Sequence, residues 1–134
     1  MSAPDTDSST PLGRVRALGS SHHGGGHWIR ERLTSAALLL LGTWFVASLL
    51  LLPGLDHKTV ADWLRSAGGA VPMALFVIAA FVHAVDGLKV VVDDYVHDAG
   101  NNFFLNGLIL FGGIGGGALA LFSLAKIAFG APAA

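Results

Sequence analysis

The sequence predicts an all-α integral membrane protein that crosses the bilayer three times. Hydrophobic residues make up 53% of the 134-residue chain and charged residues only 13%, whereas a typical soluble domain has about 25% charged residues. The apolar residues are concentrated in three blocks of about twenty residues or more, enough to cross a hydrocarbon core of ~30 Å as helices. So small a chain could not shield all three blocks from water, but lipid would cover them.

A polar segment, residues 1–32, precedes the first block. Residues 1–12 are small, acidic and proline-containing, which is typical of disorder. A signal peptide would begin with a short basic stretch and an immediate apolar core, and a transit peptide would be poor in acids such as Asp5 and Asp7. We therefore expect residues 1–32 to stay on the chain, partly disordered.

The first spanning helix is predicted over residues 33–52, which contain no charged residue and are followed by Pro53. In the next loop, Val60, Trp63 and Leu64 share one helical face. This pattern indicates a short amphipathic turn in the membrane interface, with the tryptophan at headgroup depth.

The second spanning helix is predicted over 71–92 and the third over 103–129, so that a three-helix membrane region covers 33–130. The third contains glycines four residues apart, a spacing that permits close approach of a neighbouring helix. These glycines form the pairs Gly112 with Gly116 and Gly113 with Gly117. A phosphate-binding glycine loop would instead follow a strand.

Charge and cysteine content narrow the functional classes. The net charge of −1 gives no electrostatic basis for binding nucleic acid. The absence of cysteine excludes disulfides and cysteine-ligated iron–sulfur clusters within this chain. Half of the eight lysines and arginines precede the first helix, so the positive-inside rule places the N-terminus in the cytoplasm. These four residues are Arg14, Arg16, Arg30 and Arg32.

The second helix carries the polar residues that suggest chemistry. A charged group at the centre of a spanning helix costs about 2.5–3.5 kcal/mol or more, so such residues tend to be functional. His83, Asp86 and Gly87 fall on one helical face, which we expect to point into a bundle or a cofactor pocket. A neutral imidazole there could ligate haem iron, and Gly87 would allow a flat macrocycle close to the backbone. Alternatively, His83 forms a hydrogen bond to a neighbouring helix.

Asp94 and Tyr95 lie at the predicted membrane surface. The Tyr95 hydroxyl could donate a hydrogen bond to a quinone carbonyl, with Asp94 orienting it or relaying a proton. The alternative is an ordinary interfacial tyrosine beside solvated acids. The cluster of His22, His23 and His27 lacks a carboxylate or cysteine companion, and its role stays open.

The run from His83 to His97 resembles the hydrophobic membrane anchor family of succinate dehydrogenase (complex II). That family shows a helix-two histidine, a glycine four residues later and an Asp-Tyr pair at the helix end, which match His83, Gly87 and Asp94-Tyr95. The segment from Gly26 to Thr34 resembles the start of the family's first helix less specifically.

The resemblance implies half of a two-subunit anchor bundle in a bacterial inner membrane. A second, cytochrome b-type anchor would pair with this chain, and a flavoprotein and an iron–sulfur subunit would bind them, carrying the FAD, the clusters and the succinate-oxidising site of this tricarboxylic acid cycle enzyme. His83 would provide one axial ligand of a shared haem b, and Tyr95 with Asp94 would contact ubiquinone. Arg32 would lie near the haem propionates or the quinone.

Two rival interpretations remain. The chain could be the anchor of a fumarate reductase or of another b-type cytochrome. It could also be a non-redox assembly or transporter accessory subunit, in which His83 and its neighbours only join helices.

Overall fold

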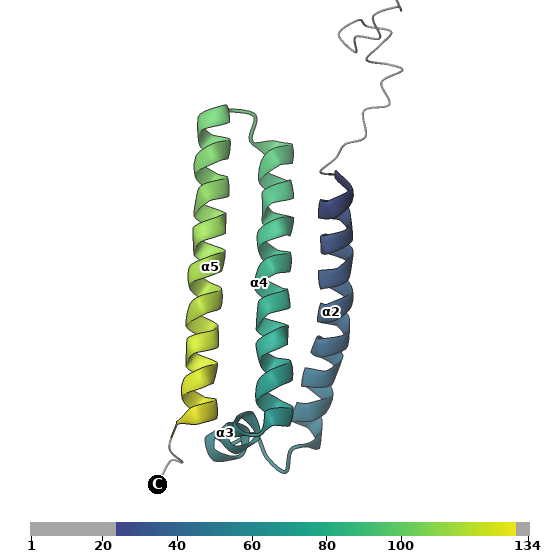
Figure 1. Cartoon of the computed structure of the whole chain (residues 1–134), viewed down its shortest axis with the longest axis vertical. Coiled ribbons are helices and arrows are strands. Elements are labelled where there is room, and N and C mark those ends of the chain that lie inside the picture. Colours follow the sequence, from purple (N-terminus) through teal and green to yellow (C-terminus); the bar gives the residue numbers. More distant parts are fainter. Residues whose placement is uncertain (1–23, 131–134) are drawn as a thin grey trace, which may run out of the picture. The chain divides into compact units, whose positions relative to one another are not determined.

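The computed structural model describes residues 24–130, which contain four helices and no strand (Figure 1). The helices are α2 (Gly24–Leu51), α3 (His57–Arg65), α4 (Ala67–Tyr95) and α5 (Ala99–Phe129). Three stretches are long and apolar enough to cross a membrane, namely Trp28–Leu51, Ala67–Tyr95 and Ala99–Phe129. The predicted all-α, three-span fold is therefore confirmed. The chain from Glu31 onward forms one compact unit, which contains the interhelical contacts described below.

The three long helices extend beyond the predicted ranges because the prediction counted only apolar residues. At 1.5 Å per residue, helices of 28, 29 and 31 residues are about 42–47 Å long. This exceeds the ~30 Å hydrocarbon core, so their polar ends can continue as helix into the headgroup region. The first helix begins at Gly24 rather than at residue 33, and α4 continues past residue 92 to Tyr95.

Side-chain caps fix the starts of α4 and α5, which were predicted four residues too late. The Ser66 hydroxyl accepts a hydrogen bond from the Gly69 amide at 3.0 Å, so that α4 begins at Ala67. The Asp98 carboxylate accepts one from the Asn101 amide at 2.9 Å, so that α5 begins at Ala99. Both caps satisfy amides that have no partner within the helix.

Large apolar side chains cover the outside of the chain. Among the described residues, the buried hydrophobic residues are Ala61, Ala79 and Leu124. Two of these three have the small alanine side chain. By contrast, Phe103 is 82% and Phe129 90% exposed. Contiguous apolar surface of this kind is unsuited to water and indicates contact with lipid or with other membrane subunits.

Glycines of α5 form its contact with α4, and the two helices lie side by side in Figure 1. A Cβ on Gly113 would overlap Val85 Cγ2, and one on Gly116 would lie 2.7 Å from the Phe81 ring. Gly117 also faces Phe81, at 3.4 Å. The predicted close packing is thus confirmed at these three positions. It is not found at Gly112, where a Cβ would meet nothing within 4 Å.

An aromatic cluster joins α2, α3 and α4. The Trp44 and Trp63 rings stack at 5.6 Å between centroids, and Phe45 stacks on Phe76 at 5.8 Å. The amphipathic helix predicted around Trp63 is therefore present as α3, and its tryptophan packs on the protein. The end of α3 approaches α4 so closely that a Cβ on Gly69 would overlap the Trp63 carbonyl oxygen.

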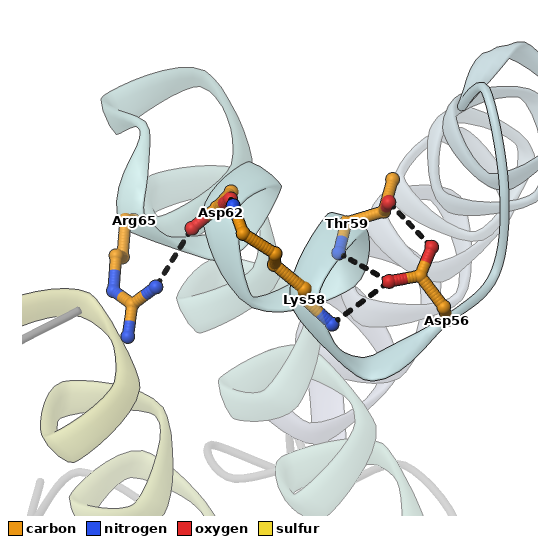
Figure 2. Close-up of polar contacts among 5 residues, drawn as sticks. All are labelled: Asp56, Lys58, Thr59, Asp62 and Arg65. Atoms are coloured by element: carbon orange, nitrogen blue, oxygen red, sulfur yellow. Dashed lines mark hydrogen bonds and ion pairs between the residues drawn. The ribbon is translucent and has the colours of Figure 1, made fainter. Parts of the chain in front are cut away.

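Polar contacts stabilise the exposed side of α3 (Figure 2). The Asp56 carboxylate accepts hydrogen bonds from the Thr59 hydroxyl at 2.6 Å and from the Lys58 and Thr59 amides at 3.1 Å. Asp62 pairs with Lys58 at 2.9 Å and with Arg65 at 2.7 Å. The bonds from the Thr59 side chain and backbone lower the pKa of Asp56, and those from Lys58 and Arg65 lower the pKa of Asp62.

The Asp56 cap is expected to weaken in acid. Because its pKa is lower in the folded chain than the ordinary value of 3.8, its stabilisation is fully present above that value. The stabilisation is lost as the pH falls through the lower, folded pKa. We expect the NMR shift of the Thr59 amide to titrate with a midpoint below 3.8 in detergent. The Asp56→Asn variant, which keeps an acceptor but cannot titrate, should show no such step, and a midpoint at or above 3.8 would contradict the cap.

Candidate functional site

His83 lies in the interior of α4, twelve residues before its last residue, or about 18 Å along the helix axis. The side chain is half-buried. Its Nδ1 atom lies 3.1 Å from the Thr34 hydroxyl of α2, and the Thr34 hydroxyl also donates to the Glu31 carbonyl at 3.0 Å. The interpretation of His83 as a helix-joining residue is therefore confirmed. It does not compete with haem ligation, because an imidazole has two ring nitrogens and Thr34 engages only one.

Gly87 follows His83 by four residues, on the same side of α4. A Cβ at this position would meet no other atom within 4 Å. This chain therefore leaves space beside the backbone one turn from His83. The half-buried imidazole and the space at Gly87 lie on one face of α4, and the cofactor pocket expected there stays a prediction.

Arg32 does not share the α2 face that meets His83. It precedes Thr34 by two residues, which is a rotation of roughly 200° about the helix. Its side chain is exposed. Any role of Arg32 at a haem propionate or a quinone must therefore be on a different side of α2 from the Thr34 contact.

Asp94 and Tyr95 are the last residues of α4, and both side chains are exposed. Tyr95 is 79% exposed, so its hydroxyl is accessible to a partner or a ligand. Neither side chain forms a hydrogen bond to another described residue. The structure thus separates this pair from His83 along the helix.

Asp93 has a different role from its neighbour Asp94. Its Oδ1 atom accepts hydrogen bonds from the side-chain amides of Asn106 at 2.9 Å and Asn102 at 3.1 Å. Asn102 also donates to the Val96 carbonyl at 3.3 Å. These bonds connect the end of α4 to the first turns of α5, through the residues on either side of the Asp94-Tyr95 pair.

Asn102, Asn106 and Thr34 were not among the residues predicted from the sequence. The signal was available, because polar side chains at the ends of spanning helices commonly bond across helices. The polar residues of α4 have separate surroundings: His83 reaches α2, Asp93 bonds to α5, and Asp86 is buried at 5% exposure. His22, His23 and the side chain of His27 lie outside the described residues.

Comparison with known proteins identifies the group to which this architecture belongs. Residues 6–114 match the family model described as succinate dehydrogenase/fumarate reductase transmembrane subunit. No solved structure matches the chain significantly.

Curated relatives carry a consistent description. The chain is similar to the succinate dehydrogenase hydrophobic membrane anchor subunit of Paracoccus denitrificans, with 28% identity over 122 residues, covering 91% of this chain and 94% of that protein. The subunit of the same name from Rickettsia bellii is 28% identical over 83 residues, which cover 62% of this chain and 66%, just under two thirds, of that protein. The Rickettsia conorii subunit is 26% identical, covering 67% of this chain and 72% of that protein. With three spanning helices and a family match over most of its length, the chain belongs to the succinate dehydrogenase/fumarate reductase transmembrane subunit family.

Proposed function

We propose that this chain is a membrane anchor subunit of a bacterial succinate:ubiquinone oxidoreductase. It pairs with a second, cytochrome b-type anchor and holds the flavoprotein and iron–sulfur subunits, with their FAD and clusters, at the cytoplasmic face of the inner membrane. In this arrangement its N-terminus is cytoplasmic. The observation that carries the proposal is the half-buried His83 in the interior of a spanning helix, with one nitrogen bonded to Thr34 and open space at Gly87.

The residues around His83 fit a haem b. A neutral histidine is a common axial ligand of haem iron, and a ligating histidine normally donates its other N–H to an oriented acceptor. In this chain, His83 would provide the ligand, Thr34 the acceptor, and Gly87 the space beside the backbone. Because His83 would be this chain's one ligand to the iron, the partner anchor would have to provide any second protein ligand. When bound, the haem supplies a one-electron redox centre within the bilayer.

Tyr95 and Asp94 would form this chain's part of the ubiquinone site. A phenol hydroxyl can donate to a quinone carbonyl, and donation stabilises the negative charge that develops on that oxygen during reduction. The exposed Asp94 carboxylate beside it could accept and return a proton, because quinol formation takes up two protons. The bonds from Asn102 and Asn106 to Asp93 fix the helix end that presents both side chains.

The proposed function is tested by purifying the tagged chain in mild detergent with whatever associates with it. We expect succinate-dependent ubiquinone reduction to follow the tag through purification. Faster fumarate reduction with a low-potential quinol would instead assign the chain to a fumarate reductase. Co-purifying proteins without either activity would contradict the proposal and favour an assembly role.

Tyr95→Phe is expected to lower quinone reduction at least about tenfold, since it removes a single donor that acts in the transition state. Succinate oxidation with a soluble dye should remain, because that reaction would take place in the partner subunits. The measurement compares both activities in the same preparation. Phe104→Tyr, which adds a hydroxyl on an exposed α5 side chain, controls for surface changes. An equal loss of both activities in Tyr95→Phe would indicate an assembly defect instead of a quinone contact.

A further inference from the structure

Thr34 holds the His83 ring through a hydroxyl that has only one proton to donate. That proton is directed to the Glu31 carbonyl oxygen, 3.0 Å away and one helical turn earlier in α2. The Thr34 hydroxyl oxygen itself lies 3.1 Å from His83 Nδ1. A carbonyl oxygen cannot donate, so the Thr34 hydroxyl can form both hydrogen bonds at once only by donating to Glu31 and accepting from His83 Nδ1–H.

This direction of donation determines the tautomer of His83. A neutral imidazole has a single N–H, so a proton on Nδ1 leaves Nε2 with its lone pair free. Nε2 makes no hydrogen bond to a described residue. The opposite arrangement, with Thr34 donating to Nδ1, would put the proton on Nε2 and prevent this nitrogen from binding a metal.

We propose that Thr34 is a positioning residue for haem ligation: it fixes His83 in the Nδ1–H tautomer and orients the ring so that Nε2 is the ligand. The inference rests on the proposed function of His83 and extends it to a residue on a different helix. By accepting the hydrogen bond from Nδ1–H, Thr34 also raises the basicity of Nε2, the proposed ligating nitrogen. Thr34 should therefore stabilise the ferric state and lower the midpoint potential of the haem.

The tautomer is tested on the full chain without haem, in detergent, by NMR of ¹⁵N-labelled histidine. The chain has six histidines, and His83→Gln identifies the resonance that belongs to His83. We expect a proton on Nδ1 in the wild type and in Thr34→Ser, and a mixture of tautomers in Thr34→Val. A wild-type ring protonated on Nε2, or an unchanged ring in Thr34→Val, overturns the inference.

The consequence for the haem is tested in the assembled complex. Thr34→Val has nearly the shape of threonine but no hydroxyl, and we expect its haem to dissociate about tenfold faster, with a more positive midpoint potential. Thr34→Ser keeps the hydroxyl and should restore both values. If Thr34→Val keeps the wild-type dissociation rate and midpoint potential, the hydroxyl does not position the ligand. The same conclusion follows if Thr34→Ser gives the values of Thr34→Val.

Haem ligation by His83 and the positioning role of Thr34 are contradicted by different results. If His83→Leu keeps the low-spin haem spectrum, the ligand assignment in the proposed function is wrong, and the positioning role toward the haem fails with it. If His83→Leu loses the haem while the wild-type ring is protonated on Nε2 in the haem-free chain, only the inference about Thr34 fails.

Discussion

Replacing His83 with leucine is expected to reduce the haem content of the purified complex at least ~10-fold. Loss of a residue that merely orients a ligand already weakens metal binding by about 10–100-fold, and loss of the ligand itself should cost more. Leucine is well tolerated within a spanning helix, so α4 should still insert. The measurement is the reduced-minus-oxidised spectrum per mole of complex.

His97→Leu is the matched control, because His97 is exposed and lies beyond the end of α4. It should retain wild-type haem content. If both variants lose haem equally, the effect is on assembly. If His83→Leu retains haem, the histidine serves only to join α4 to α2 through Thr34.

Replacing Gly113 with leucine is expected to separate α4 from α5 and to lower the yield of folded chain severely. Even a single carbon at this position would overlap Val85, and leucine adds three more. Overpacking of a tight contact typically lowers the stability of a protein by about 1–3 kcal/mol. Here the added atoms would overlap the Val85 side chain on the facing helix. Membrane helices depend on such close approach, because no hydrophobic force drives them together in lipid.

The measurement is the temperature at which half of the chain leaves the monodisperse peak in size-exclusion chromatography. Gly112→Leu is the matched control, since a Cβ there would meet nothing within 4 Å. Its stability should remain close to that of the wild type in the isolated chain. Equal stability of Gly113→Leu and Gly112→Leu would mean that the α4–α5 contact does not depend on a small residue at position 113.

The number and type of helices could be predicted because they depend on hydropathy and length alone. Three apolar blocks in a chain of this size have few alternatives to spanning the membrane. The helix ends could not be located by the same reasoning. They depend on individual side chains such as Ser66 and Asp98, which cap α4 and α5 several residues outside the apolar blocks.

The contacts between helices were harder to predict than the helices. The membrane part of α2 is apolar on all sides, so its sequence does not reveal which face meets α4. A hydrogen bond from His83 to a neighbouring helix could be anticipated, but its partner Thr34 could not be distinguished from the other hydroxyl residues of α2. The same limit applies to α5, where the two glycine pairs have equal spacing and only the rotation of the helix distinguishes Gly113 from Gly112. His83, Gly87 and Tyr95 were singled out because their types and spacing are unusual in a spanning helix, which does not require knowledge of packing.

The short connection between α4 and α5 has a consequence for biogenesis. Only residues 96–98 separate the two helices, and Asn102 and Asn106 bond back to Asp93 across the turn. Such a hairpin can close as soon as the ribosome has released α5, before any other subunit is available. We therefore expect α4 and α5 to leave the translocon as one insertion unit, which would protect the polar end of α4 from the lipid while the chain awaits its partners.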